Sequence, residues 1–118
     1  MKELIIPDSV TRIGEFCFDK CSNLTEIKIS TNLKEIDIYC FNNLNNLKEL
    51  IIPDSITYLG SRCFEKCTNL TKIRISTNLK EIGDNCFDDC NNLKELIIPN
   101  NVTKIGKYCF NNYENLSK

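Results

Sequence analysis

A 23-residue repeat is the feature that most constrains how this chain can fold. Cysteine recurs at that interval, each time followed by phenylalanine, at Cys17, Cys40, Cys63, Cys86 and Cys109. The 118 residues divide into five units (1–23, 24–46, 47–69, 70–92 and 93–115), and residues 116–118 open a sixth. A period of this size indicates a solenoid, in which each unit buries its apolar side against its neighbours. We therefore predict one solenoid domain over residues 1–118.

Within each unit, numbered as positions 1 to 23, the pattern of side chains predicts three short segments. Positions 3 to 6 alternate between outward and inward residues, which is typical of a half-buried strand. Proline follows at position 7 in alternate units and should end that strand, because it lacks the N–H that a ladder needs. Positions 10 to 13 fit a second extended segment. Positions 15 to 21 space Cys63, Phe64 and Cys67 as one turn of α-helix or 3₁₀-helix would.

Position 14 is glycine in every unit except the second, where it is Asp37. Glycine enters the region of positive φ freely, and aspartate tolerates it better than most residues do. The pattern therefore predicts a left-handed turn at this position.

The string L-x-x-I-x-I-P-x-x-V-x-x-I-G-x-x-C-F closely resembles the repeat of the BspA-like leucine-rich repeat family, and the likeness covers all five units. The resemblance implies an α/β solenoid: a right-handed superhelix with short parallel strands on its concave face and short helical or 3₁₀ turns on its convex face. Members of that family are usually cell-surface or secreted proteins linked to adhesion and protein binding. The resemblance alone suggests that location here, since no signal-peptide segment opens the sequence, and a fold does not fix a function.

Charge and composition argue against several classes of function. The 15 basic and 16 acidic residues nearly balance, whereas a nucleic-acid-binding face normally has a basic excess. The chain has no histidine, the commonest general base and metal ligand, and no nucleophile–base pair emerges from the repeat. The longest apolar runs are as short as Leu4-Ile5-Ile6, so no membrane insertion is predicted. We expect a non-catalytic protein without a cofactor.

The eight cysteines allow three interpretations: a disulfide framework, metal sites built from Cys-x₃-Cys pairs, or buried free thiols acting as small apolar side chains. Leu44 and Tyr113 occupy the same repeat position as Cys21, Cys67 and Cys90, which favours an apolar slot and buried thiols. Asparagine at position 23 is expected to form a hydrogen-bonded ladder through the turn into the next unit. That ladder would comprise Asn23, Asn46, Asn69, Asn92 and Asn115.

Outward residues of the first strand predict a partner-binding concave face, on which an exposed isoleucine alternates with a cation from unit to unit. The candidate residues are Glu3, Ile5, Glu26, Lys28, Glu49, Ile51, Lys72, Arg74, Glu95 and Ile97. A solvated sheet whose charges pair between units is the alternative.

Neither end has the polar cap that repeat proteins normally carry. The apolar pattern is complete in the first and last units, so a second copy could stack head to tail and form a filament. The candidate end-stacking residues are Leu4, Ile6, Ile13, Phe18, Leu96, Ile98, Ile105, Phe110, Tyr113 and Leu116. An interaction or adhesion scaffold is the first prediction and a self-assembling structural subunit the alternative, with a protein partner, a second copy, or both.

Overall fold

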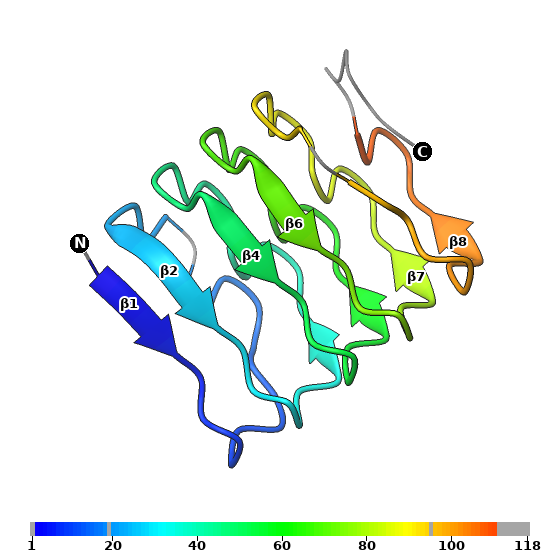
Figure 1. The fold of residues 1–118 in the computed structure, drawn as a ribbon, viewed down its shortest axis with the longest axis horizontal. Helices are drawn as coiled ribbons and strands as arrows, with labels where there is room; N and C mark the ends of the chain where they lie inside the picture. Colours follow the sequence, from blue (N-terminus) through cyan, green and yellow to red (C-terminus); the bar gives the residue numbers. More distant parts are fainter. Residues whose placement is uncertain (1, 19, 95, 111–118) are drawn as a thin grey trace.

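The fold is a solenoid of stacked coils, seen in a computed structural model that describes residues 2–18, 20–94 and 96–110 (Figure 1). Each repeat unit forms one coil, and we number the coils 1 to 5 in chain order. Eight short strands are present in the described residues: β1 (Lys2–Ile5), β2 (Leu24–Lys28), β3 (Glu35–Ile36), β4 (Glu49–Ile51), β5 (Tyr58–Leu59), β6 (Lys72–Arg74), β7 (Glu81–Ile82) and β8 (Lys104–Ile105). Every strand pair is parallel, so the prediction of stacked parallel strands is confirmed.

Strands β1, β2, β4 and β6 lie on one side of the solenoid, where positions 3 to 6 were predicted to be extended (Figure 1). β1 pairs with β2, and β4 pairs with β6, with Leu50 opposite Ile73. β4 ends at Ile51, shortly before Pro53, as the missing proline donor predicts. β2 and β4 are neighbours that belong to separate two-stranded sheets, so the hydrogen-bonded ladder is interrupted between coils 2 and 3.

Strands β3, β5, β7 and β8 form one four-stranded sheet and confirm the second extended segment for coils 2 to 5, whereas residues 10–13 of coil 1 form no strand. At each junction between successive coils of this sheet the same two backbone hydrogen bonds form, one just before the paired strands and one just after them. Between coils 3 and 4, for example, the N–H of Lys80 donates to the carbonyl of Thr57, and the N–H of Gly83 donates to the carbonyl of Leu59, at 2.9 and 2.8 Å.

The prediction of a helical convex side is wrong for the residues that the structure describes, which contain turns and no helix at positions 15 to 21. Two residues in this stretch have positive φ in most coils, and a right-handed helix cannot continue through them. Alternate N–H groups of this stretch donate to the next coil: that of Phe64 donates to the carbonyl of Cys86, at 3.0 Å. The N–H groups between them donate within their own turn, as that of Glu65 does to the carbonyl of Arg62, at 3.3 Å. The residues with positive φ are Phe16, Lys20, Tyr39, Asn43, Arg62, Lys66, Asn85, Asp89 and Tyr108.

The prediction of a left-handed glycine at position 14 is also wrong, because no described glycine has positive φ. Glycine is needed there for close approach between coils. A Cβ on Gly83 would lie 2.5 Å from the backbone nitrogen of Ser61 in the preceding coil, and one on Gly60 would lie 2.7 Å from the carbonyl carbon of Asp37. Gly14, in the first coil, would meet nothing within 4 Å.

Asp37 carries a Cβ at this crowded position, and the contact between coils 1 and 2 is open at that place. β3 has no partner strand in coil 1. Among the described residues, neither of the two backbone hydrogen bonds that flank the strands at the other junctions forms between coils 1 and 2. A cleft of about 350 Å³ takes their place, with Arg12, Ile13 and Lys34 in its walls. Coil 1 stays attached through the β1–β2 pair and through the turn, where the N–H of Phe18 donates to the carbonyl of Cys40 at 2.9 Å.

The core lies between the strand side and the turns and is built from the inward positions of each unit. A column of phenylalanine rings runs through it, with neighbouring centroids 5.4 to 5.6 Å apart and near-parallel planes, and its members are Phe18, Phe41, Phe64, Phe87 and Phe110. The three central rings are fully buried, whereas Phe18 and Phe110 are only partly so. Each inner coil therefore depends on both of its neighbours for burial.

Candidate functional site

The outward side of β1, β2, β4 and β6, together with Ile97, forms what we call the strand face. All of its described members predicted from the sequence are exposed: Glu3, Ile5, Glu26, Lys28, Glu49, Ile51, Lys72, Arg74 and Ile97. Glu95 lies outside the described residues. The exposed fractions of Ile5, Ile51 and Ile97 are 58%, 61% and 76%. Strand alternation turns Ile5 and Ile51 to solvent, and Ile97, which occupies the same repeat position without a strand, is exposed as well.

Two grooves cross the strand face, both at junctions where an even coil meets the following odd coil. One, of about 750 Å³, lies over the interrupted ladder between β2 and β4 and contains Ile51 in its wall. The other, of about 720 Å³, lies between β6 and the segment of Leu96 and Ile97. Lys72 and Arg74 line both grooves. Lys48 and Lys94 line one groove each, and the sequence analysis missed them. The signal that could have found them is the recurrence of lysine at position 2 of coils 1, 3 and 5.

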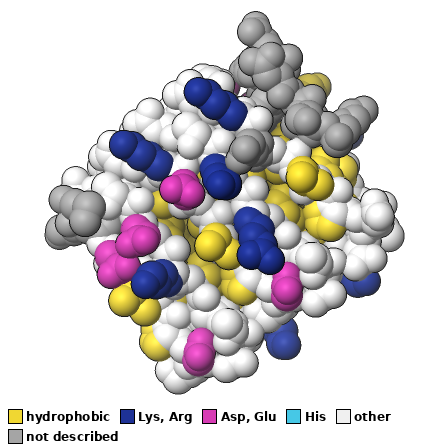
Figure 2. Space-filling view, in the orientation of Figure 1, with side chains coloured by type: hydrophobic (Ala, Val, Ile, Leu, Met, Phe, Trp, Pro, Cys, Tyr) yellow, Lys and Arg dark blue, Asp and Glu magenta, His cyan; other side chains and the backbone are white. Residues whose placement is uncertain are grey.

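Charge is distributed unevenly over the strand face. Acidic side chains gather at the β1–β2 end, and over β4 and β6 basic side chains lie beside apolar ones and an acidic one (Figure 2). Glu49 is the outward, exposed acidic residue of β4. Glu3 and Glu26 face each other in register, and the hydrogen bond and negative charge of Glu3 raise the pKa of the Glu26 carboxyl. The Nζ of Lys28 lies 3.8 Å from a carboxylate oxygen of Glu3, which partly neutralises this end.

The two end faces are less well covered than the middle of the solenoid. Of the predicted end-stacking residues, Leu4, Ile13, Phe18, Ile98 and Phe110 are partly buried, and Ile105 is exposed. Ile6 and Leu96 are already buried within the chain. Phe16 and Tyr108, which the sequence pattern missed, are among the most exposed aromatic side chains described. Tyr113 and Leu116 lie outside the described residues.

All eight cysteines are free thiols in the structure, and six of them are buried. Burial raises the pKa of the Cys40 thiol to about 12, with a further contribution from Cys17. The Sγ atoms of Cys63 and Cys86 are 3.3 Å apart, and Cys67 donates to the carbonyl of Phe41 at 3.5 Å. Cys17 and Cys21, both in coil 1, are exposed, which corrects the expectation of a wholly buried column.

We predict that thiol-specific labelling of the native chain modifies two cysteines rapidly, and all eight once the chain is denatured. Thiolate is the reactive form, and both burial and a raised pKa suppress it. Ellman titration followed by peptide mass mapping measures both the count and the positions. Rapid labelling of Cys63 or Cys86 would contradict the buried column.

The asparagine ladder is confirmed for three of its five members. The Nδ2 groups of Asn46, Asn69 and Asn92 donate to the carbonyls of Ser22, Asn45 and Thr68, at 2.7, 2.7 and 2.8 Å. Asn115 lies outside the described residues. A second ladder at position 9, which sequence reasoning missed, joins the Nδ2 groups of Asn32, Asn78 and Asn101 to carbonyls of the coil before.

Within the described part of the chain, no three Cys, Asp or Glu side chains are grouped so that they could hold a metal ion. That part also has no helix of the length and apolar character that crossing a bilayer requires.

The comparison with protein families gives a match over residues 1–117 to the model described as a BspA type leucine-rich repeat region (6 copies). The chain therefore belongs to the BspA-type leucine-rich repeat family, which is a family of repeat scaffolds. The resemblance read from the repeat is thus confirmed. A search among curated proteins gives no match.

Several solved structures share the fold. The pneumococcal vaccine antigen PcpA is similar with a TM-score of 0.85 and 25% identity, over 96% of this chain and 28% of that one. A leucine-rich repeat protein of T. pallidum is similar with a TM-score of 0.67 and 26% identity, over 88% of this chain and 59% of that one. A leucine-rich cell surface protein of Faecalibacterium prausnitzii shares the fold with a TM-score of 0.70 and 23% identity, over 95% and 36%. The chain thus spans less than two thirds of the length of each of these proteins.

Proposed function

We propose that this chain is a non-catalytic protein-binding scaffold, and that the strand face is its binding surface. The observation that carries the proposal is the regular exposure of Ile5, Ile51 and Ile97, together with two grooves of more than 700 Å³ that Ile51 and Ile97 line. Isolated exposed apolar side chains need no explanation, but a periodic set on one rigid face is typical of a contact surface. We also propose a role at the cell surface, in adhesion, because the chain belongs to the BspA-type leucine-rich repeat family, whose members are typically surface proteins.

The proposal is tested by selecting a displayed library of random peptides against the immobilised chain. Enriched peptides are then measured against a double variant that combines Ile51→Asp with Ile97→Asp. We expect a loss of affinity of about tenfold or more, because truncating a central apolar anchor of an interface commonly costs over about 1 kcal/mol. Since both side chains are largely exposed, the double variant should keep its thermal unfolding midpoint.

Ile105→Asp is the matched control, because Ile105 is also exposed but lies on β8, in the second sheet. The proposal would be overturned if the enriched peptides had the same affinity for the double variant as for the wild type, because the peptides would then bind outside the strand face. Peptides that lose affinity only for the Ile105→Asp variant would point to the second sheet instead.

Head-to-tail association of copies is a second candidate function, favoured by the phenylalanine column at Phe18 and by exposed aromatic side chains in coils 1 and 5. Phe18 is partly buried and stacks on one described ring, that of Phe41, and Phe16 and Tyr108 expose 52% and 67% of their surface. A second copy could continue the column, and such a heterologous contact leads to filaments unless it closes. Light scattering over a range of concentrations tests this: the mass should rise for the wild type and not for Phe16→Glu. A wild type that stays monomeric at every concentration excludes it.

A further inference from the structure

The strand face combines apolar and charged side chains at a fixed spacing, and this spacing constrains what can bind there. Along position 5, isoleucine and cation alternate from coil to coil, and the C-terminal part of the series is Ile51, Arg74 and Ile97. Stacked parallel strands are about 4.8 Å apart. β4 and β6 are paired at that spacing, and Ile97 lies one coil beyond β6, across the second groove. Two coil steps, about 10 Å at the spacing of stacked strands, thus separate Ile51 from Ile97, and Arg74 belongs to the coil between them.

A segment that contacts both isoleucines must run across the strands and not along them, because the two side chains come from different coils. Along an extended strand, successive side chains on one face are only about 7 Å apart. In an α-helix, residues i and i+7 share a face and lie about 10.5 Å apart, with i+3 and i+4 about 4.5 to 6 Å from the first. The helical spacing thus fits the two isoleucines and supplies a contact at the intervening cation.

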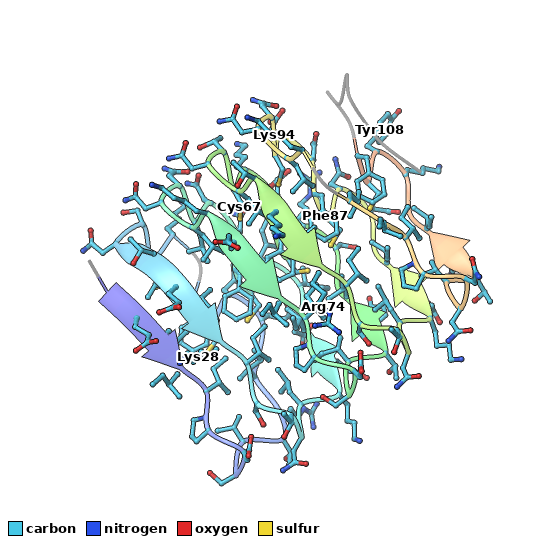
Figure 3. The ribbon with its side chains drawn as sticks, viewed as in Figure 1. Lys28, Cys67, Arg74, Phe87, Lys94 and Tyr108 are labelled. Atoms are coloured by element: carbon cyan, nitrogen blue, oxygen red, sulfur yellow. The ribbon has the colours of Figure 1, made fainter. Side chains whose placement is uncertain are left out.

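Electrostatics distinguishes this half of the strand face from the other. Arg74 has no ion pair with any described residue; Figure 3 labels its side chain and that of Lys94. Lys48 lines one of the two grooves that Arg74 borders, and Lys94 lines the other. The nearby Asp54 carboxylate accepts a hydrogen bond from the N–H of Thr77 at 3.0 Å; this bond, more than the charge of Arg74, lowers its pKa. At the β1–β2 end, by contrast, Lys28 pairs with Glu3, and Glu26 stands beside it. A carboxylate is therefore better placed over Arg74 than over Lys28.

We propose that the partner bound by the strand face is an amphipathic, acidic α-helix lying across β4 and β6. Its apolar residues at i and i+7 pack on Ile51 and Ile97, and its carboxylates at i+3 or i+4 lie over Arg74. This inference rests on the proposed function and adds to it the conformation and charge of the partner. Helices that present one apolar stripe to a groove are a recurrent mode of peptide recognition.

The test uses three synthetic peptides as probes, measured by fluorescence anisotropy at low and physiological salt. The first is a stapled helix with leucine at i and i+7 and glutamate at i+3 and i+4. The second replaces both glutamates by lysine, and the third keeps the first composition but contains a central proline that breaks the helix. We expect the first peptide to bind the wild-type chain at least about tenfold more tightly than either of the others, and more weakly as salt increases.

Protein variants then assign the contact. Arg74→Glu should weaken the acidic helix about tenfold or more and strengthen the lysine helix, a reversal that a damaged fold would not produce. Lys80→Glu is the matched control, because it makes the same change of charge at an exposed residue beside β7, in the second sheet, and should alter neither affinity.

Equal binding of the acidic and basic helices, or of the helical and proline-broken peptides, would overturn the inference, as would no binding of the acidic helix. The proposed function has a separate test, because library peptides that depend on Ile51 and Ile97 would still support it. Failure of both tests would remove the strand face as a binding surface.

Discussion

The Phe64→Ala variant is expected to lose about 3–5 kcal/mol of unfolding free energy, the largest effect that we predict for a single substitution. Phe64 is fully buried at the centre of the phenylalanine column, and its ring stacks on Phe41 and Phe87 with centroids 5.5 and 5.6 Å apart. Removing the ring leaves a cavity that the two neighbouring coils cannot close, because their spacing is fixed by backbone hydrogen bonds at the turn. Urea unfolding followed by circular dichroism measures the loss.

Phe18→Ala is the matched control, since Phe18 is only partly buried and stacks on a single described ring. We expect it to cost less than half as much as Phe64→Ala. Because the loss at Phe64 is of the order of a small domain's whole stability, Phe64→Leu gives a milder second variant that should remain folded. Equal costs at Phe18 and Phe64 would contradict the column in which each inner ring depends on both neighbours.

The Gly83→Ala variant is expected to lose about 1–3 kcal/mol, the cost of forcing a methyl group into close-packed surroundings. A Cβ on Gly83 would lie 2.5 Å from the backbone nitrogen of Ser61, so coils 3 and 4 must move apart there. This movement strains the hydrogen bond from the N–H of Gly83 to the carbonyl of Leu59. Amide hydrogen exchange should show faster exchange at Gly83, together with a lower urea midpoint.

Gly14→Ala is the control for the intrinsic effect of alanine, because a Cβ on Gly14 would meet nothing within 4 Å. It should be neutral or slightly stabilising through the loss of chain entropy in the unfolded state. Asp37→Gly is the reciprocal change: with its Cβ removed, coil 1 can approach coil 2 as the other coils approach one another. We expect protection of amide protons in residues 34–37 to rise. Unchanged exchange there would contradict the role given to Asp37 in holding the cleft open.

The repeat period, both extended segments and the outward orientation of the strand-face residues could be predicted from the sequence. They depend on alternation and on spacing, which a local pattern records directly. Ile51 illustrates this: its position in the unit alone predicts that it points outward, and 61% of its surface is exposed.

The turns and the glycines were predicted wrongly because contacts between coils determine them. The spacing of Cys63, Phe64 and Cys67 fits a helix, but the N–H of Phe64 donates to Cys86, 22 residues away in the next coil. Likewise, glycine at position 14 would permit a left-handed turn, yet it is required by the backbone of the coil before. Local propensity could not separate these alternatives, since both place the same residues inside.

The grooves were also beyond a sequence prediction, because they arise where the ladder between β2 and β4 is interrupted. Lysine at position 2 lines one groove in coil 3 and the other in coil 5. Its recurrence in alternate units can be assigned to a groove only after the grooves themselves have been located. The acidic end of the strand face, by contrast, follows directly from glutamate at position 3 in coils 1 and 2.

The alternation of isoleucine and cation along position 5 sets a rule for how such a protein can change in length. Gain or loss of 46 residues keeps the phase of the series and simply adds or removes one apolar–basic pair. Gain or loss of 23 residues would instead place two isoleucines or two cations in successive coils at the site of the change, and so break the alternation there. Even-numbered duplication would therefore extend the surface into a multivalent one, in which avidity grows with length while the chemistry of each contact stays the same.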